Sequence, residues 1–148
     1  MRLALYQPDI PQNTGTLLRL GAALDVPVDL IEPAGFILDD KRLGRALMDY
    51  GRLVDLTRHR DWQAFEEART GRLLLLTTKA ETHFTDFTFH ANDILLLGSE
   101  SAGVPPSVHD AADHRLTIPM RAEARSLNVA VAGAMVLSEA LRQTRWHR

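Results

Sequence analysis

The stretch Ile94-Leu95-Leu96-Leu97-Gly98-Ser99-Glu100 places four aliphatic residues directly before a glycine, a serine and a glutamate. A similar aliphatic run, Leu73-Leu74-Leu75-Leu76, lies earlier in the chain. Short runs that are apolar at every position are typical of central strands in a parallel sheet, because helices cover both faces of such strands. Ligands of these sheets bind beyond the carboxyl ends of the strands, so the loops after such runs are the places to look for a site.

Strand and helix patterns alternate along the whole chain. The predicted strands are Leu3–Tyr6, Val28–Ile31, Leu53–Leu56, Leu73–Thr77, Ile94–Leu97 and Arg115–Ile118. The predicted helices are Thr16–Leu24, Asp39–Met48, Asp61–Arg69, Pro105–Ala112 and Leu127–Arg145. This alternation predicts an α/β fold with a mostly parallel sheet and helices on both faces. Because the chain has no internal repeat, low-complexity tract or Gly/Ser linker, we expect a single domain over residues 1–148.

The composition excludes several classes of chemistry. The chain has 148 residues, 45% hydrophobic and 24% charged, and no cysteine. Disulfides, Cys-ligated zinc, iron–sulfur clusters and a catalytic thiolate are therefore excluded. The histidines are scattered without metal-ligand spacing, so we expect no metal site and mostly surface histidines. No stretch approaches the ~18 apolar residues of a membrane span, and we expect a cytoplasmic protein without a membrane partner.

The charge balance argues against nonspecific coating of nucleic acid. The net charge is −2 and the pI is about 6.3, whereas nonspecific affinity comes from neutralising many phosphates. Local basic sites are still compatible with this balance. Two basic clusters stand out, and each suits either phosphate binding or a solvated face: Arg52, Arg58, His59 and Arg60; and Arg142, Arg145, Trp146, His147 and Arg148.

The loop after the first predicted strand reads Gln7-Pro8-Asp9-Ile10-Pro11-Gln12-Asn13-Thr14-Gly15. Asn13, Thr14 and Gly15 suit a tight turn and a helix cap, which is the simplest interpretation of the segment. Arg19 would then lie one turn inside the helix, where a cation opposes the helix dipole. That mild cost is a weak indication of function.

Two later loops have equally unusual compositions. Residues 98–106, Gly-Ser-Glu-Ser-Ala-Gly-Val-Pro-Pro, lack the Lys-Ser/Thr of a phosphate-binding loop and the first glycine of a nucleophile elbow. Gly98 permits close approach of the backbone to a ligand, and Glu100 lies in the same loop. In the third loop, Ile118-Pro119-Met120 precedes Arg125-Ser126-Leu127-Asn128, an apolar strand end beside a polar cluster that suits a flat aromatic ring. Ordinary turns and caps explain each loop alone.

The three loops together resemble the three motifs of the SpoU branch of the SPOUT RNA methyltransferases. The motifs are Pro-x-Asn-Thr-Gly-x-x-x-Arg, Gly-x-Glu-x-x-Gly-x-Pro, and Ile-Pro-Met followed by Arg-Ser-Leu-Asn, and they span nearly the whole chain. The small tRNA (cytidine/uridine-34-2′-O)-methyltransferases are the most similar group within that branch. Three further segments resemble the same group: Ile31-Glu32-Pro33, Asp39-Asp40-Lys41-Arg42-Leu43 and Leu76-Thr77-Thr78-Lys79.

The resemblance implies transfer of a methyl group from S-adenosylmethionine to the ribose 2′-hydroxyl of the wobble nucleotide of tRNA, leaving S-adenosylhomocysteine and using no metal. It also implies a homodimer, recognition of the anticodon stem-loop, and a trefoil knot in the C-terminal half. The residues that it assigns to the cofactor are Leu76, Thr77, Gly98, Glu100, Ile118, Met120, Ser126 and Leu127.

The resemblance assigns the chemistry to a second, overlapping set: Arg19, Asn13, Glu100, Ser126 and Asn128. Arginine holds its proton tightly, so we expect Arg19 to polarise the hydroxyl and to fix the phosphate or ribose, while the identity of the proton acceptor stays open. One departure is informative: residues 129–132 read Val-Ala-Val-Ala where many relatives have Leu-Ser-Asn-Ala. A noncatalytic RNA- or nucleotide-binding module on the same fold is therefore the alternative hypothesis.

Overall fold

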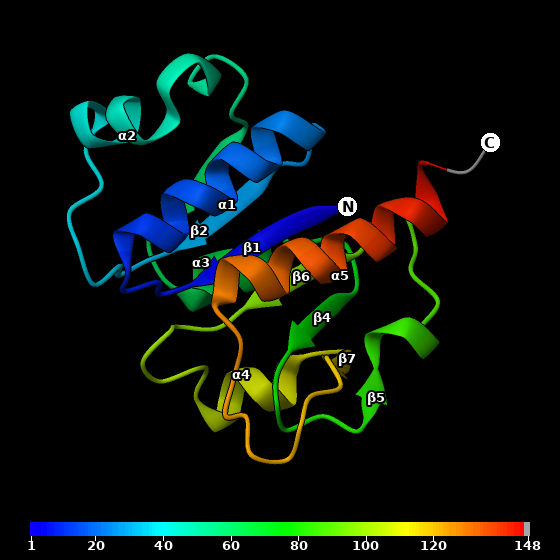
Figure 1. Ribbon diagram of the computed structural model, residues 1–148. Helices are drawn as coiled ribbons and strands as arrows, with labels where there is room; N and C mark the ends of the chain where they lie inside the picture. Colours follow the sequence, from blue (N-terminus) through cyan, green and yellow to red (C-terminus); the bar gives the residue numbers. More distant parts are fainter. Residues whose placement is uncertain (147–148) are drawn as a thin grey trace.

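Seven parallel strands form the centre of the structure, a computed structural model that describes residues 1–146 (Figure 1). The strands are β1 (Arg2–Tyr6), β2 (Val28–Ile31), β3 (Leu56–His59), β4 (Leu73–Leu76), β5 (Thr82–His83), β6 (Ile94–Leu97) and β7 (His114–Thr117). Their order in the sheet is β3-β2-β1-β6-β4-β7-β5, and every pairing is parallel. The aliphatic runs at β6 and β4 lie at the centre of the sheet, as their sequence predicts.

The register of the central strands aligns their carboxyl ends. Leu97, the last residue of β6, pairs with Leu5 on one side and with Leu76, the last residue of β4, on the other. The loops that follow these strands therefore leave the sheet at the same edge, which is where ligands of parallel sheets bind.

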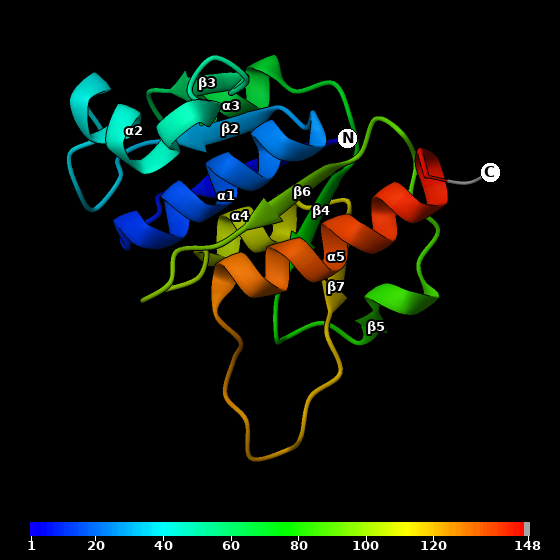
Figure 2. The same ribbon diagram turned by 45° about the horizontal axis from the view of Figure 1, so that its top comes forward.

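Helices cover both faces of the sheet, as expected. The helices are α1 (Pro11–Leu24), α2 (Asp40–Leu47), α3 (Trp62–Ala68), α4 (Pro106–Ala111) and α5 (Val129–Thr144), with 3₁₀ turns η1 (Met48–Tyr50) and η2 (Phe84–Asp86). One core cluster packs α1 and α5 on one face, and a second packs α3 and α4 on the other (Figures 1 and 2). Gly133 lets α5 approach the sheet, because a Cβ there would lie 2.8 Å from Leu97 Cδ1. Within the described residues, no helix is long and apolar enough to cross a membrane.

The predicted strand Leu53–Leu56 is wrong, because β3 spans Leu56–His59. Leu53 is 63% exposed and precedes the strand. β3 lies at the edge of the sheet and is held by polar contacts: Arg58 binds the Glu32 carboxylate, and His59 Nε2 lies 2.8 Å from Asp29 Oδ1. Hydrophobic patterning therefore misplaces it. Smaller differences occur at β4, which ends before Thr77, and at β7, which begins and ends one residue earlier than predicted; β5, η1 and η2 were not predicted.

The first helix begins at Pro11, five residues before the predicted start at Thr16. Proline suits the first helical turn because it has no N–H to leave unpaired there. Asn13, Thr14 and Gly15 are therefore buried helical residues, and the turn and cap predicted for them are wrong. Arg19 consequently lies in the middle of the helix, so the argument from the helix dipole does not apply to it. The other four helices begin and end within two residues of the predicted positions. Asp39, Asp61 and Asn128 act as the N-caps of α2, α3 and α5.

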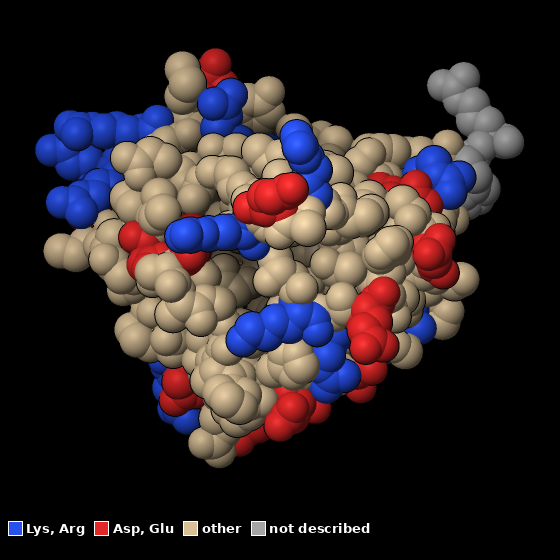
Figure 3. All heavy atoms as spheres, turned by 60° about the horizontal axis from the view of Figure 1, so that its bottom comes forward, with Lys and Arg blue, Asp and Glu red and all other residues tan. Residues whose placement is uncertain are grey.

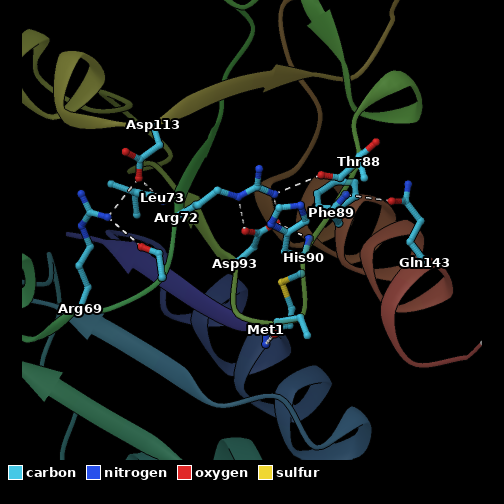
Figure 4. A network of polar contacts seen from close by, with 12 residues as sticks. Met1, Arg69, Arg72, Leu73, Thr88, Phe89, His90, Asp93, Asp113 and Gln143 are labelled. Atoms are coloured by element: carbon cyan, nitrogen blue, oxygen red, sulfur yellow. Dashed lines mark hydrogen bonds and ion pairs between the residues drawn. The ribbon is translucent and has the colours of Figure 1, made fainter.

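A polar network fixes the opposite, amino-terminal edge of the sheet (Figure 4). Asp93, only 1% exposed, accepts two hydrogen bonds of 2.7 Å from the Arg72 guanidinium and one of 2.7 Å from the His90 N–H. Gln143 of α5 accepts from the Phe89 N–H at 2.9 Å. These contacts tie β4, the segment before β6 and α5 together, at the sheet edge opposite the carboxyl ends of the strands.

Candidate functional site

A pocket of about 480 Å³ lies at the carboxyl ends of β4, β6 and β7. Its walls come from the residues that end or follow these strands, from the start of α1 and from the segment that enters α5: Ile10, Asn13, Leu75–Thr78, Leu97–Glu100, Gly103, Val104, Thr117, Ile118, Met120, Ser126–Val129 and Ala132. The side of the molecule seen in Figure 3 has a hollow between Lys and Arg side chains. The volume lies in the range of small-molecule and cofactor sites.

The β6–α4 loop forms one wall by folding back on itself. The Ser99 N–H donates to the Gly103 carbonyl at 3.0 Å, and the Gly103 N–H donates to the Ser99 carbonyl at 2.8 Å. A Cβ on Gly98 would lie 3.0 Å from the Gly103 backbone, and Gly103 has a φ of +64°. Both positions therefore favour glycine, which brings bare backbone to the pocket.

A chain of side-chain hydrogen bonds connects the three sequence motifs. Asn13 Nδ2 donates to Glu100 Oε1 at 3.4 Å, and Asn128 Nδ2 donates to Asn13 Oδ1 at 3.0 Å. Asn128 Oδ1 in turn accepts from the N–H groups of Ala130 and Val131 at 2.9 and 3.2 Å. The N-cap of α5 is thus coupled through α1 to the glutamate of the β6–α4 loop.

Asp9 fixes Glu100 from the other side. The Asp9 N–H donates to Glu100 Oε2 at 2.9 Å, the Glu100 N–H donates to Asp9 Oδ1 at 3.1 Å, and the Ser101 hydroxyl donates to Asp9 Oδ2. Burial, and then the Asp9 carboxylate, raise the pKa of Glu100. Hydrogen bonding with Glu100 and then Ser101 lowers the pKa of Asp9. Sequence reasoning did not select Asp9, although it lies in the same loop as Asn13.

All the predicted site residues except Arg19 line this pocket. Arg19 is exposed on α1, and its guanidinium carbon lies 5.4 Å from the centre of the Tyr50 ring in η1. The departure at residues 130 and 131 also lies outside the lining: Ala130 is buried, and Val131 is 52% exposed. Their backbone N–H groups donate to a pocket residue, Asn128.

Intramolecular contacts occupy much of both predicted basic clusters. Arg58 donates to the Leu38 carbonyl at 2.7 Å as well as binding Glu32. Arg142 forms a bidentate pair with Glu139, both distances 2.8 Å, and Arg145 donates to the carbonyls of Leu24 and Asp25. His147 and Arg148 lie outside the described residues.

The described histidines are mostly on the surface, as expected. His83, His90 and His114 are exposed, whereas the His59 side chain is only 10% exposed and contacts Asp29. Among residues 1–146, no group of three or more His, Asp or Glu side chains is arranged to hold a metal ion.

Sequence comparison relates the chain to RNA methyltransferases. The model of the SpoU rRNA Methylase family matches residues 1–138. A tRNA (cytidine(34)-2′-O)-methyltransferase from Beijerinckia indica is 60% identical over 144 residues, which cover 95% of this chain and 90% of that protein. A protein of the same name from Escherichia coli K12 is 42% identical over 146 residues, covering 97% of this chain and 93% of that protein.

Solved structures agree with the sequence comparison. A structure described as giving insights into the 2-OH methylation of C/U34 on tRNA has a TM-score of 0.90 and 42% identity, and the match covers 96% of this chain and 94% of that one. The SpoU methyltransferase AviRb from Streptomyces viridochromogenes, solved with AdoMet, has a TM-score of 0.85 at 24% identity, covering 97% of this chain and 60% of that one. The second likeness concerns the fold alone.

Proposed function

The chain belongs to the SpoU rRNA Methylase family, and we propose that it transfers a methyl group from S-adenosylmethionine to the ribose 2′-hydroxyl of nucleotide 34 of tRNA. The names of the relatives support this reaction and this substrate. One observation on this chain supports the same reaction: residues of all three motifs line one pocket, and hydrogen bonds join the side chains of Glu100, Asn13 and Asn128.

The pocket fits S-adenosylmethionine. Leu76, Ile118, Met120 and Leu127 offer apolar walls to a purine, and the backbone around Gly98 and Thr77 offers hydrogen bonds to its edge. Glu100 is the one ionisable side chain in the described lining, and a negative charge suits a cationic ligand. When bound, this cofactor supplies a methyl group that its positively charged sulfur has already activated. Its product is S-adenosylhomocysteine.

The residues of the chain then have to position the hydroxyl and take up one proton. Transfer from an activated methyl group requires in-line geometry and proton removal, but neither a metal ion nor a covalent nucleophile. We assign Asn13, Ser126 and Asn128 to orienting the ribose and shaping the site, because all three line the pocket and Asn13 and Asn128 are joined to Glu100 by hydrogen bonds. We assign Arg19 to polarising the hydroxyl and binding a neighbouring phosphate.

We propose a homodimer for two reasons. Val131 and Met135 lie one turn apart in α5 and are 52% and 40% exposed, and Leu127, just before the N-cap of α5, is 39% exposed. Together they form an apolar stripe that a second copy would cover. Arg19 does not line the pocket of its own chain. A second copy is then the source of the cation that the site requires.

We propose that tRNA contacts the surface formed by α1, α2 and η1, which pack against one another. Arg19, Lys41, Arg45 and Arg52 are exposed there, and none of them forms a salt bridge within the described residues. Unpaired arginine and lysine side chains are available to phosphates, unlike the paired Arg58 and Arg142. The anticodon stem-loop is the part of the tRNA that this surface would meet, since nucleotide 34 lies in it.

We further propose the single domain over residues 1–148, the trefoil knot and a cytoplasmic location. The knot is supported by the path of the chain: after β7 it passes through residues 118–128, of which both ends line the pocket, and returns to pack α5 on β6. The noncatalytic alternative has less support than the sequence alone suggested. It rested on the mildly acidic pI and on the replacement at residues 130 and 131, and neither of those two side chains lines the pocket.

Methyl transfer to tRNA tests the proposed function. The protein is incubated with methyl-labelled S-adenosylmethionine and tRNA from a host that lacks the modification, and the label is located by nuclease digestion. We expect label in an alkali-resistant dinucleotide that contains nucleotide 34, because a 2′-O-methyl group blocks alkaline cleavage at that ribose. Cofactor binding and tRNA binding without transfer would instead support the noncatalytic module.

A further inference from the structure

The reaction releases a proton, and the pocket offers one side chain to accept it. The described lining consists of aliphatic, glycine, hydroxyl and amide residues together with a single titratable group, Glu100. A hydroxyl is a weak nucleophile, and a positioned base that takes its proton accelerates such transfers by about 100-fold or more.

We propose that Glu100 is the general base of the reaction, an inference that rests on the proposed function. The bond between the 2′-oxygen and the methyl carbon forms while the bond between that carbon and sulfur breaks. The bonding electron pair stays on sulfur, which becomes a neutral thioether. The hydroxyl proton moves to Glu100 Oε1 and afterwards leaves to water, which restores the carboxylate.

The geometry of Glu100 suits this role. Oε2 is held by the Asp9 N–H at 2.9 Å, whereas Oε1 receives only the longer Asn13 contact of 3.4 Å. A carboxylate oxygen has two lone pairs, so Oε1 can accept a further proton while Asp9 and Asn13 keep the side chain in place. Burial and the neighbouring Asp9 carboxylate raise the pKa of Glu100. A raised pKa makes a carboxylate a better base near neutral pH.

Arg19 is a weaker candidate for the same role. Its guanidinium is always protonated under ordinary conditions, so it has no lone pair with which to accept a proton. It is also exposed, lies over Tyr50 and does not line the pocket of its own chain. Polarisation of the hydroxyl by Arg19 and proton removal by Glu100 are compatible within one step.

The first test compares Glu100→Gln with Glu81→Gln, which makes the same chemical change at an exposed residue outside the pocket. With saturating cofactor and tRNA, we expect single-turnover transfer by Glu100→Gln to fall by about 100-fold or more, while Glu81→Gln stays near wild type. Calorimetry with S-adenosylmethionine measures the cofactor affinity of the three proteins separately from the saturated rate, so that affinity lost with the Glu100 charge is not counted as lost proton transfer. If the cofactor affinity of Glu100→Gln falls while its saturated rate is kept, Glu100 holds the cofactor and the proposal is overturned.

The second test uses Asp9, whose carboxylate accepts from the Glu100 N–H. Asn13, which contacts the Glu100 carboxylate, and Ser101, which contacts Asp9, are neutral. The wild-type rate should rise with pH and level off above the pKa of Glu100, because only the carboxylate accepts a proton. Burial is the larger cause of the raised pKa of Glu100 and remains in Asp9→Asn, but this variant removes the contribution of the Asp9 carboxylate, so the rise in rate should move to lower pH. In Glu100→Gln, this rise of the rate with pH should be absent.

Carbon-13 NMR titration of the glutamate carboxyl groups, without cofactor or tRNA, provides a readout that does not depend on activity. The resonance missing from the Glu100→Gln spectrum should titrate above the ordinary pKa of a glutamate in wild type and move down in Asp9→Asn. If Asp9→Asn lowers the pKa read from the Glu100 resonance but leaves the pH dependence of the rate unchanged, another group removes the proton. If wild type places no label at nucleotide 34, the proposed function fails and this proposal fails with it; an active Glu100→Gln contradicts this proposal alone.

Discussion

At the scale of single residues, Arg19 distinguishes catalysis from cofactor binding. Because it lies over Tyr50 and outside the pocket of its own chain, Arg19→Ala should leave the affinity for S-adenosylmethionine unchanged. Transfer to tRNA should fall by about 100-fold, the usual cost of losing one donor that stabilises a reacting oxygen. Arg142→Ala is the matched control, because Arg142 is exposed and paired with Glu139. Loss of cofactor binding in Arg19→Ala would contradict the role assigned to it.

The sequence predicted residues of the pocket better than it predicted the contacts between them. Gly98, Ile118 and Ser126 were identified from motifs whose order is readable along the chain. Asp9 was missed because its role depends on a contact with Glu100, which is far away in sequence. Arg19 was predicted as a site residue but does not line the pocket of its own chain, because a linear motif does not specify where each of its side chains lies in the fold.

At the scale of elements, the network around Asp93 should carry stability rather than activity. Asp93→Ala removes both carboxylate oxygens that bind Arg72 and leaves the His90 N–H without its acceptor. We expect the free energy of unfolding in urea to fall by about 3 kcal/mol, the low end for a broken buried pair, because the Arg72 side chain keeps 30% exposure. Asp86→Ala, at an exposed residue of η2, should change it by less than about 0.5 kcal/mol.

The folded fraction of Asp93→Ala should retain wild-type affinity for S-adenosylmethionine, because the network and the pocket lie at opposite edges of the sheet. If Asp93→Ala is as stable as wild type, the network does not stabilise the fold. If the folded variant loses cofactor affinity, the network and the pocket are not independent.

Element prediction succeeded where hydrophobic burial determines the structure. β4 and β6 are apolar at every position and buried at nearly all of them, so their composition identifies them. β3 is an edge strand whose polar residues make specific contacts, and patterning placed it three residues too early. α1 begins at Pro11 without a side-chain cap, so the cap signal used to find helix starts pointed to residues further along.

At the scale of the whole molecule, the strand order explains why distant segments form one site. β6 lies between β1 and β4, so the loops after all three strands meet at one edge although they are separated along the chain. The sequence predicted a parallel sheet but not this strand order. Uniformly apolar strands could pair in several orders, and the observed order depends on the crossover connections and on helix packing. The sequence also did not indicate which surface the proposed second copy would cover.

The apolar stripe on α5 leads to a prediction about assembly. Val131→Asp places a carboxylate among Leu127 and Met135, and a twofold interface would bury that unpaired charge twice. In sedimentation experiments we expect wild type to be a dimer and Val131→Asp a monomer at the same concentration. Ser107→Asp, an exposed residue of α4 on the other face of the sheet, should remain a dimer. If the second copy supplies Arg19, the monomeric variant should still bind S-adenosylmethionine but transfer no methyl group. A dimeric Val131→Asp would place the interface elsewhere, and a monomeric variant with full activity would show that each pocket is complete within its own chain.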